Sequence, residues 1–140
     1  MKLFQNLSLI VFSFLAITAF VNVNHNSAAN HLNAPDVTGC WVYKTYKDGA
    51  YTYTKKDDFA SNKPGFKFKA NNEMTKRLDP NWCVRVAGPY TNLEGTYEFL
   101  EDEVIKTTYQ CPISDKPSIN KYKILEVSAK KLILKSLPRD

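Results

Sequence analysis

The feature that most constrains the fold of this chain is a two-residue alternation of apolar and polar side chains, which recurs in short runs after residue 38. It is clearest in Gly65–Ala70, where Phe66, Phe68 and Ala70 alternate with lysines. Period-two alternation places successive side chains on opposite faces of a β-strand. No run after residue 38 keeps the 3.6-residue period of an amphipathic helix. The pattern therefore predicts an all-β domain.

Turn-forming residues separate these runs; Asp48-Gly49, for example, predicts a tight hairpin turn. About eight short strands at near-even spacing are typical of an antiparallel sandwich or barrel, and a closed barrel leaves no exposed strand edge. We therefore expect an eight-stranded antiparallel up-and-down barrel over residues 38–140. The predicted strands are Cys40–Tyr46, Tyr51–Thr54, Gly65–Ala70, Met74–Leu78, Leu93–Phe99, Glu103–Gln110, Ile119–Val127 and Lys131–Ser136, with a further extended run at Trp82–Val86.

The first 29 residues predict a secretory signal peptide. Lys2 precedes an apolar run from Leu9 to Val21, and polar residues and Ser27-Ala28-Ala29 follow it. The run is shorter than the ~20 residues that a bilayer-spanning helix needs. We therefore expect cleavage after Ala29, no integral membrane segment in the mature chain, and an exported protein that is secreted or held in the periplasm or cell envelope. Residues 30–37 are expected to form a loose N-terminal arm.

Three cysteines, Cys40, Cys83 and Cys111, follow the leader. Disulfides persist in exported proteins, so the count predicts one disulfide and one unpaired thiol. We expect Cys83 to pair with Cys111, although sequence alone leaves the other pairings open. The odd thiol is interpreted as a small buried apolar side chain. Val37-Thr38-Gly39-Cys40 is similar to a lipidation box, but it lies far from the apolar run, so lipidation is not expected.

The mature chain lacks the side chains for most catalytic and metal chemistry. Its one histidine, His31, lies in the predicted arm, so Ser-His and Cys-His pairs are excluded from the barrel. Cys-x-x-Cys spacing is absent, so we expect no metal and no cofactor. Loss of Lys2 with the leader lowers the net charge from +5 to +4, and we expect no nucleic-acid partner. A thiol-dependent enzyme using Cys40 or Cys83 stays a third alternative.

The order of several short motifs resembles that of a known family. The motifs are Gly39-Cys40-Trp41, Gly65-Phe66-Lys67-Phe68 followed by Asn71, Arg77, Trp82-Cys83, Leu93-Glu94-Gly95-Thr96-Tyr97, Tyr122-Lys123-Ile124 and Lys131-Leu132-Ile133-Leu134. Together they resemble a bacterial, Bacteroidetes-type secreted lipocalin-like domain of the calycin group. The resemblance implies that Gly39 and Trp41 form the structural signature, with Trp41 plugging the closed end of the barrel. It also implies that a late basic residue, Lys135 or Arg139, packs over the indole.

An inward apolar and aromatic surface is the candidate binding site. An eight-stranded barrel is just wide enough to be filled by its own side chains or to hold one small ligand. We expect non-catalytic binding of a small hydrophobic molecule, with tyrosine hydroxyls orienting its polar end. The alternative is a cell-envelope module that binds a protein or glycan, which a filled barrel and exposed Phe59 or Tyr90 would favour. The predicted ligand-binding residues are Tyr43, Phe66, Phe68, Tyr97, Phe99, Tyr122, Ile124, Leu132 and Leu134.

Overall fold

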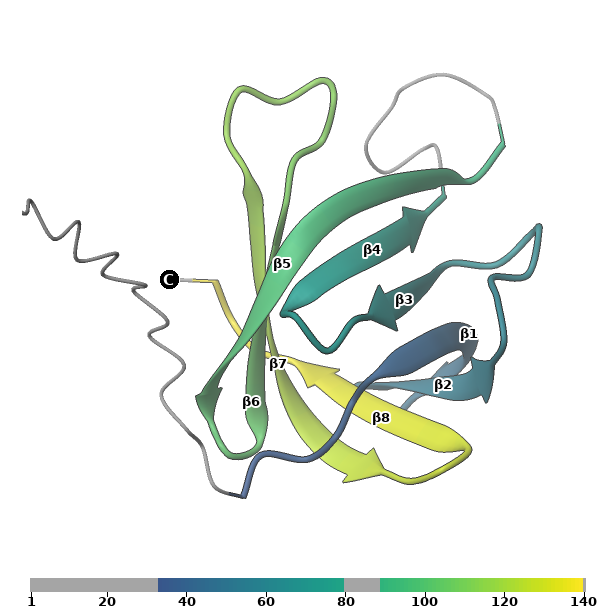
Figure 1. Ribbon diagram of the computed structural model, residues 1–140, viewed down its shortest axis with the longest axis vertical. Helices are drawn as coiled ribbons and strands as arrows, with labels where there is room; N and C mark the ends of the chain where they lie inside the picture. Colours follow the sequence, from purple (N-terminus) through teal and green to yellow (C-terminus); the bar gives the residue numbers. More distant parts are fainter. Residues whose placement is uncertain (1–32, 80–88, 140) are drawn as a thin grey trace, which may run out of the picture.

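In a computed structural model, the chain forms a closed, eight-stranded antiparallel β-barrel (Figure 1). The structure describes residues 33–79 and 89–139. Within those two ranges there is no helix that is long and apolar enough to cross a membrane. The strands are β1 (Gly39–Lys47), β2 (Ala50–Lys56), β3 (Gly65–Phe68), β4 (Glu73–Leu78), β5 (Thr91–Glu101), β6 (Val104–Tyr109), β7 (Ser118–Val127) and β8 (Lys131–Ser136). The predicted all-β class and eight-stranded barrel are confirmed.

Two predicted segments lie outside the described residues. These are the leader, residues 1–29, and the extended run Trp82–Val86. Both stay predictions from the sequence.

The strands do not all pair with their neighbours in sequence. Around the barrel their order is β1-β2-β8-β7-β6-β5-β4-β3, and β3 closes on β1. From β3 to β8 the chain forms a sequential antiparallel meander, and the β1–β2 hairpin fills the gap with β1 beside β3 and β2 beside β8. The predicted up-and-down connectivity is therefore wrong at the hairpin. As a result, β2 and β3 run in the same direction on either side of β1.

The connection between β2 and β3, residues 57–64, covers the outer face of β1. Cys40 and Val42 alternate with the inward-facing Trp41, yet they are only 3% and 5% exposed. The Pro64 carbonyl accepts a hydrogen bond from the Tyr43 amide at 2.9 Å, which joins the connection to β1. An apolar Cys-Trp-Val run is apolar on both faces of a strand and needs cover on both. We call residues 57–64 the crossover.

The β1–β2 hairpin turns where the sequence predicts. Asp48 has a φ of 52° and Gly49 a φ of 79°. Positive φ at both central residues defines the type I′ turn, whose twist matches that of paired strands and which favours Asp-Gly. The turn residues therefore specify the hairpin, independently of which strands flank it.

The antiparallel pairing gives the barrel two distinct ends. The β1–β2 turn, the β6–β7 connection and the last residues of β8 lie at one end, which we call the tyrosine end. The β3–β4, β5–β6 and β7–β8 turns and the start of β1 lie at the other, the tryptophan end. In Figure 1 the segment before β1 passes along this second end of the barrel.

Candidate functional site

The nine side chains predicted to bind a ligand all come together in the barrel. Seven are buried in one hydrophobic cluster, and Tyr43 and Phe99 are partly buried against it. The rings touch one another: Phe66 stacks on Phe68 with centroids 5.3 Å apart, and Tyr97 meets Phe68 edge-on at 4.9 Å. The structure therefore shows the predicted grouping, and the binding of a ligand there stays a prediction.

Trp41 closes the tryptophan end. Its Nε1 donates a 2.6 Å hydrogen bond to the Val37 carbonyl, and Val37 is itself only 2% exposed. The last residue of the predicted loose arm therefore belongs to the core. Gly39, the other signature residue, has a φ of 122°, and a Cβ there would lie 2.5 Å from Lys55 Cε. Both signature residues thus help to close this end.

The basic residue that covers Trp41 is Lys55, whose Nζ lies 5.1 Å from the ring centroid. The expectation that Lys135 or Arg139 does so is wrong. Lys135 is exposed on β8, and Arg139 donates to Asn120 Oδ1 at 3.2 Å. The strand order gives the reason, because β2, which carries Lys55 opposite Trp41, separates β8 from β1.

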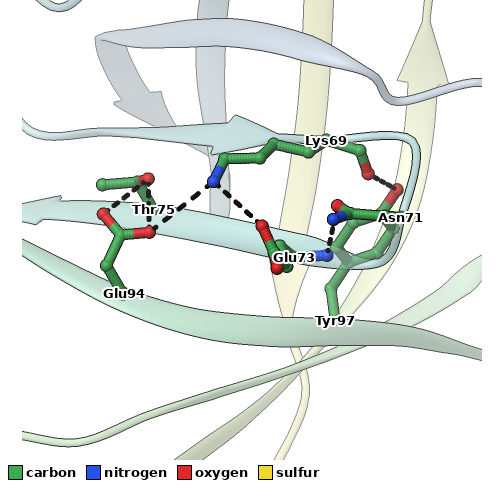
Figure 2. Close-up of polar contacts among 6 residues, drawn as sticks. All are labelled: Lys69, Asn71, Glu73, Thr75, Glu94 and Tyr97. Atoms are coloured by element: carbon green, nitrogen blue, oxygen red, sulfur yellow. Dashed lines mark hydrogen bonds and ion pairs between the residues drawn. The ribbon is translucent and has the colours of Figure 1, made fainter.

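A polar network fastens the β3–β4 turn at the tryptophan end (Figure 2). Lys69 Nζ lies 3.0 Å from Glu73 and 4.0 Å from Glu94, and Glu94 accepts hydrogen bonds from the Thr75 hydroxyl at 3.0 and 3.1 Å. The hydroxyl of Tyr97 reaches from the interior and donates to the Lys69 carbonyl at 2.8 Å. The polar atom of this interior tyrosine therefore has a partner at the barrel rim.

Strand β4 places a lysine inside the barrel. Lys76 lies between Met74 and Leu78 on the inward face and is only 7% exposed. Its Nζ lies 3.3 Å from the centroid of the Phe66 ring. Within the described part of the chain the amine makes no hydrogen bond and no ion pair. Burial lowers the pKa of Lys76 from 10.5 to about 7, because desolvation disfavours the charged amine.

Two more polar side chains with unpartnered hydroxyls surround the same ring. Tyr53 on β2 and Tyr122 on β7 meet Phe66 edge-on, with centroids 5.4 and 5.8 Å from its own. They are 5% and 8% exposed, and neither hydroxyl hydrogen-bonds to any residue that the structure describes. Burial raises the pKa of both phenols well above 10, so both stay neutral hydrogen-bond donors at neutral pH. We call Lys76, Phe66, Tyr53 and Tyr122 the Phe66 site.

The sequence contains a signal for Lys76, which is absent from the predicted binding residues. Met74, Lys76 and Leu78 share one face of a strand because they are two residues apart. A lysine on the same face as two buried apolar side chains must enter the interior. Tyr53 carries a signal of the same kind, since it shares its face with Tyr51, which is partly buried.

The cysteines agree with the interpretation of one unpaired, buried thiol. Cys40 is free and lies beneath the crossover, and desolvation raises its pKa. Cys111 is disulfide-bonded. Cys83, its predicted partner, lies outside the described residues, so the pairing Cys83–Cys111 stays a prediction.

Metal-ligating clusters and surface grooves are the other kinds of candidate site. No cluster of metal-ligating side chains occurs in residues 33–79 and 89–139. A groove of about 420 Å³ lies on the outside, between the β6–β7 connection and the end of the chain, and its lining includes Lys116, Lys121 and Arg139. The groove is lined by none of the nine predicted ligand-binding residues.

Comparison with known proteins adds no identity: no family model, no curated protein and no solved structure matches this chain.

Proposed function

We propose that this protein is an exported, lipocalin-like carrier that binds one small hydrophobic molecule inside its barrel without catalysis. The observation that supports this is the Phe66 site, where Lys76, Tyr53 and Tyr122 are at most 8% exposed and where neither the amine nor the two hydroxyls hydrogen-bond to the described chain. Polar groups of buried side chains in proteins are nearly always paired. A bound molecule with an oxygen acceptor would offer these groups a hydrogen-bond partner.

Apolar contacts would supply affinity for the ligand, and polar contacts would supply selectivity. The Phe66 and Phe68 rings offer apolar area, whose burial against a ligand favours binding by ~25 cal/mol per Å². The amine and the two hydroxyls would select a ligand whose polar end accepts hydrogen bonds. The proposed ligand is therefore a mostly apolar molecule with an oxygen acceptor at one end.

The route of entry follows from the two ends of the barrel. Val37, Trp41 and Lys55 close the tryptophan end, whereas Tyr43 and Tyr51 at the other end are only partly buried. Because the core rings pack in direct contact, a ligand must displace side chains on entry. We expect it to displace Tyr43 and Tyr51, because these two rings are less deeply buried than those around Phe66.

Export is supported by two features of the sequence. The first 29 residues have the pattern of a signal peptide, and three cysteines follow it, which predicts one disulfide. Disulfides persist in oxidising compartments. A ligand carrier outside the cytoplasm is consistent with both.

Native mass spectrometry of the mature protein, purified from its own source, tests the proposal. We expect a co-purified small molecule, and saturable binding of cinnamyl alcohol as a neutral probe. Tyr122→Phe removes one hydroxyl and should weaken probe binding about fivefold to tenfold, which corresponds to one hydrogen bond of about 1 kcal/mol or slightly more. Tyr46→Phe is the matched control, because Tyr46 is 55% exposed. A protein of bare mass that shows no saturable probe binding would reject the carrier.

A second function is favoured by one observation on the outer surface. Arg77 lies between the rings of Phe59 and Tyr90, with its guanidinium carbon 5.7 and 5.8 Å from their centroids. Both aromatic residues are partly exposed, and aromatic residues with arginine are enriched in binding interfaces. Binding of labelled protein to isolated cell envelopes, lost in a Phe59→Ser, Tyr90→Ser double variant, would support an interaction module.

A further inference from the structure

We propose that Lys76 is a covalent attachment site, at which its amine condenses with the aldehyde group of an apolar, conjugated molecule to form an imine. The inference rests on the proposed function, because the molecule must enter the same barrel. It goes further in naming the chemical class of the ligand and the atom to which it becomes bonded.

The position of Lys76 separates it from every other lysine that the structure describes. It is the single buried lysine in residues 33–79 and 89–139, and no Asp or Glu is buried with it. The titratable side chains that contact the Phe66 ring beside it are Tyr53 and Tyr122, which carry no charge at neutral pH. The amine therefore lies over an aromatic ring, and no buried carboxylate of the described chain holds it as a charged partner.

Imine formation needs the neutral amine, because its lone pair attacks the carbonyl carbon. With a pKa of about 7, Lys76 is about half neutral at pH 7. An exposed lysine with the ordinary pKa of about 10.4 is neutral in less than one molecule in a thousand at that pH. Lysines buried in apolar surroundings are the ones that serve as Schiff-base residues in proteins.

The reaction balances without an oxidant or reductant. A bond forms between Nζ and the aldehyde carbon while the carbonyl π electrons move to oxygen, and the two amine protons end on that oxygen. The carbon–oxygen bond then breaks, and the oxygen leaves as water. The aromatic walls around Lys76 would keep water out and so oppose hydrolysis of the imine. They also favour a flat, conjugated aldehyde that stacks on Phe66.

The lack of a buried carboxylate determines the protonation state of the product. Among the residues described, no acidic side chain is present in the interior to balance a charged iminium. The imine should therefore stay neutral at pH 7. With a conjugated aldehyde, the bound product should absorb at shorter wavelength than the same imine protonated in acid.

Incubation with cinnamaldehyde at pH 7, followed by sodium borohydride, which reduces a neutral imine, tests the site in the full mature protein. Peptide mapping should place at least tenfold more adduct on Lys76 than on any other lysine. Lys76→Met should lose this adduct, whereas Lys67→Met should keep it, because Lys67 points outward on the neighbouring strand and pairs with Asp58 at 3.7 Å. The yield on Lys76 should rise with pH around 7, near its pKa. Mapping the unaltered protein gives the answer even if a variant fails to fold.

Two controls separate this inference from the carrier proposal. Cinnamyl alcohol has the same shape but cannot form an imine, so it should compete with labelling of Lys76. If the alcohol binds but the aldehyde labels only exposed lysines, the imine is rejected and the carrier stands. If Lys76 is labelled but the alcohol neither binds nor competes, the imine stands and the carrier is rejected.

Discussion

Lys76 carries a free-energy penalty that its neighbours on β4 do not. A charged amine without a partner is strongly disfavoured in an apolar interior, and the response here is a pKa lowered from 10.5 to about 7. Met74, two residues earlier, is fully buried and carries no such penalty. The penalty is also the source of the neutral amine on which the proposed chemistry depends.

The free energy of unfolding should rise between pH 7 and pH 10. The unfolded chain keeps Lys76 protonated up to its ordinary pKa of 10.5, while the folded barrel releases the proton near pH 7. Between these values the unfolded state binds more protons, so stability grows by up to about 1.4 kcal/mol per pH unit. Above about pH 10 the direction reverses, because burial raises the pKa of Tyr53 and Tyr122 and the unfolded chain loses those protons first. Urea unfolding at a series of pH values should show this maximum, and a flat profile from pH 7 to pH 9 would contradict it.

Replacing Lys76 with methionine should stabilise the barrel at pH 7. The substitution keeps an unbranched apolar chain and removes the amine, so we expect a gain on the order of 2–4 kcal/mol. The rise of stability with pH should disappear in the same variant. Thermal or urea unfolding measures both effects, with Lys123→Met on the exposed face as control. Destabilisation by Lys76→Met would show that the amine has a partner that strengthens the fold.

At the scale of elements, the crossover is held against β4 by one side chain. Arg77 Nη2 donates to the Ser61 carbonyl at 3.1 Å, Nη1 donates to Asn92 Oδ1 at 3.0 Å, and the guanidinium lies over the Phe59 ring. The crossover in turn covers the Cys40 thiol on β1. Arg77 therefore fixes the crossover in place over the outer face of β1.

Arg77→Ala should open the crossover and expose Cys40. The change removes two hydrogen bonds and the stacking on Phe59, so we expect a loss of about 1–3 kcal/mol. Alkylation of the native protein by iodoacetamide should become at least tenfold faster at Cys40. Arg139→Ala removes an exposed arginine that follows β8 and should leave the rate unchanged. An unchanged rate in Arg77→Ala would mean that another contact fixes the crossover.

Sequence patterns predict the bounds of a strand better than they predict which strands lie beside it. Strand β8 begins and ends at the predicted residues, Lys131 and Ser136, because alternation and turn residues are local signals. Which strands flank β1 depends on contacts between residues far apart in the sequence. Alternation assigns each side chain to a face of its strand, and Trp41 would be buried whichever way the hairpin joined the other strands. Lys76 is absent from the predicted binding residues for a different reason. Its inward face follows from the two-residue period of a strand, and only its charge argues against burial.

At the scale of the whole molecule, the two ends of the barrel differ. The tryptophan end is closed by a hydrogen bond to the indole and by Lys55 above it, while partly buried tyrosines occupy the other. A molecule that enters the barrel should therefore perturb side chains at the tyrosine end only.

An added tryptophan at either end of the barrel should detect this difference. Tyr43 and Val127 are both partly buried against the core, and Val127 lies beside the β7–β8 turn at the tryptophan end. We expect cinnamyl alcohol to shift the emission of Tyr43→Trp and to leave that of Val127→Trp unchanged. Fluorescence titration of the two variants, each with Trp41 and Trp82 retained as a common background, measures the contrast. Equal responses would show that the ligand does not enter at the tyrosine end.

The inserted hairpin has a consequence for how the molecule can be divided. Strands β3 to β8 already form an unbroken meander, and β1 and β2 join it through two separate ladders. Cutting the backbone within the crossover would thus yield a short two-stranded piece carrying Trp41 and a longer piece carrying Lys76. The short piece holds Val37, Trp41 and Tyr53 of the buried cluster, and the long piece holds the rest. Their reassembly would restore the barrel from two chains and make a split reporter.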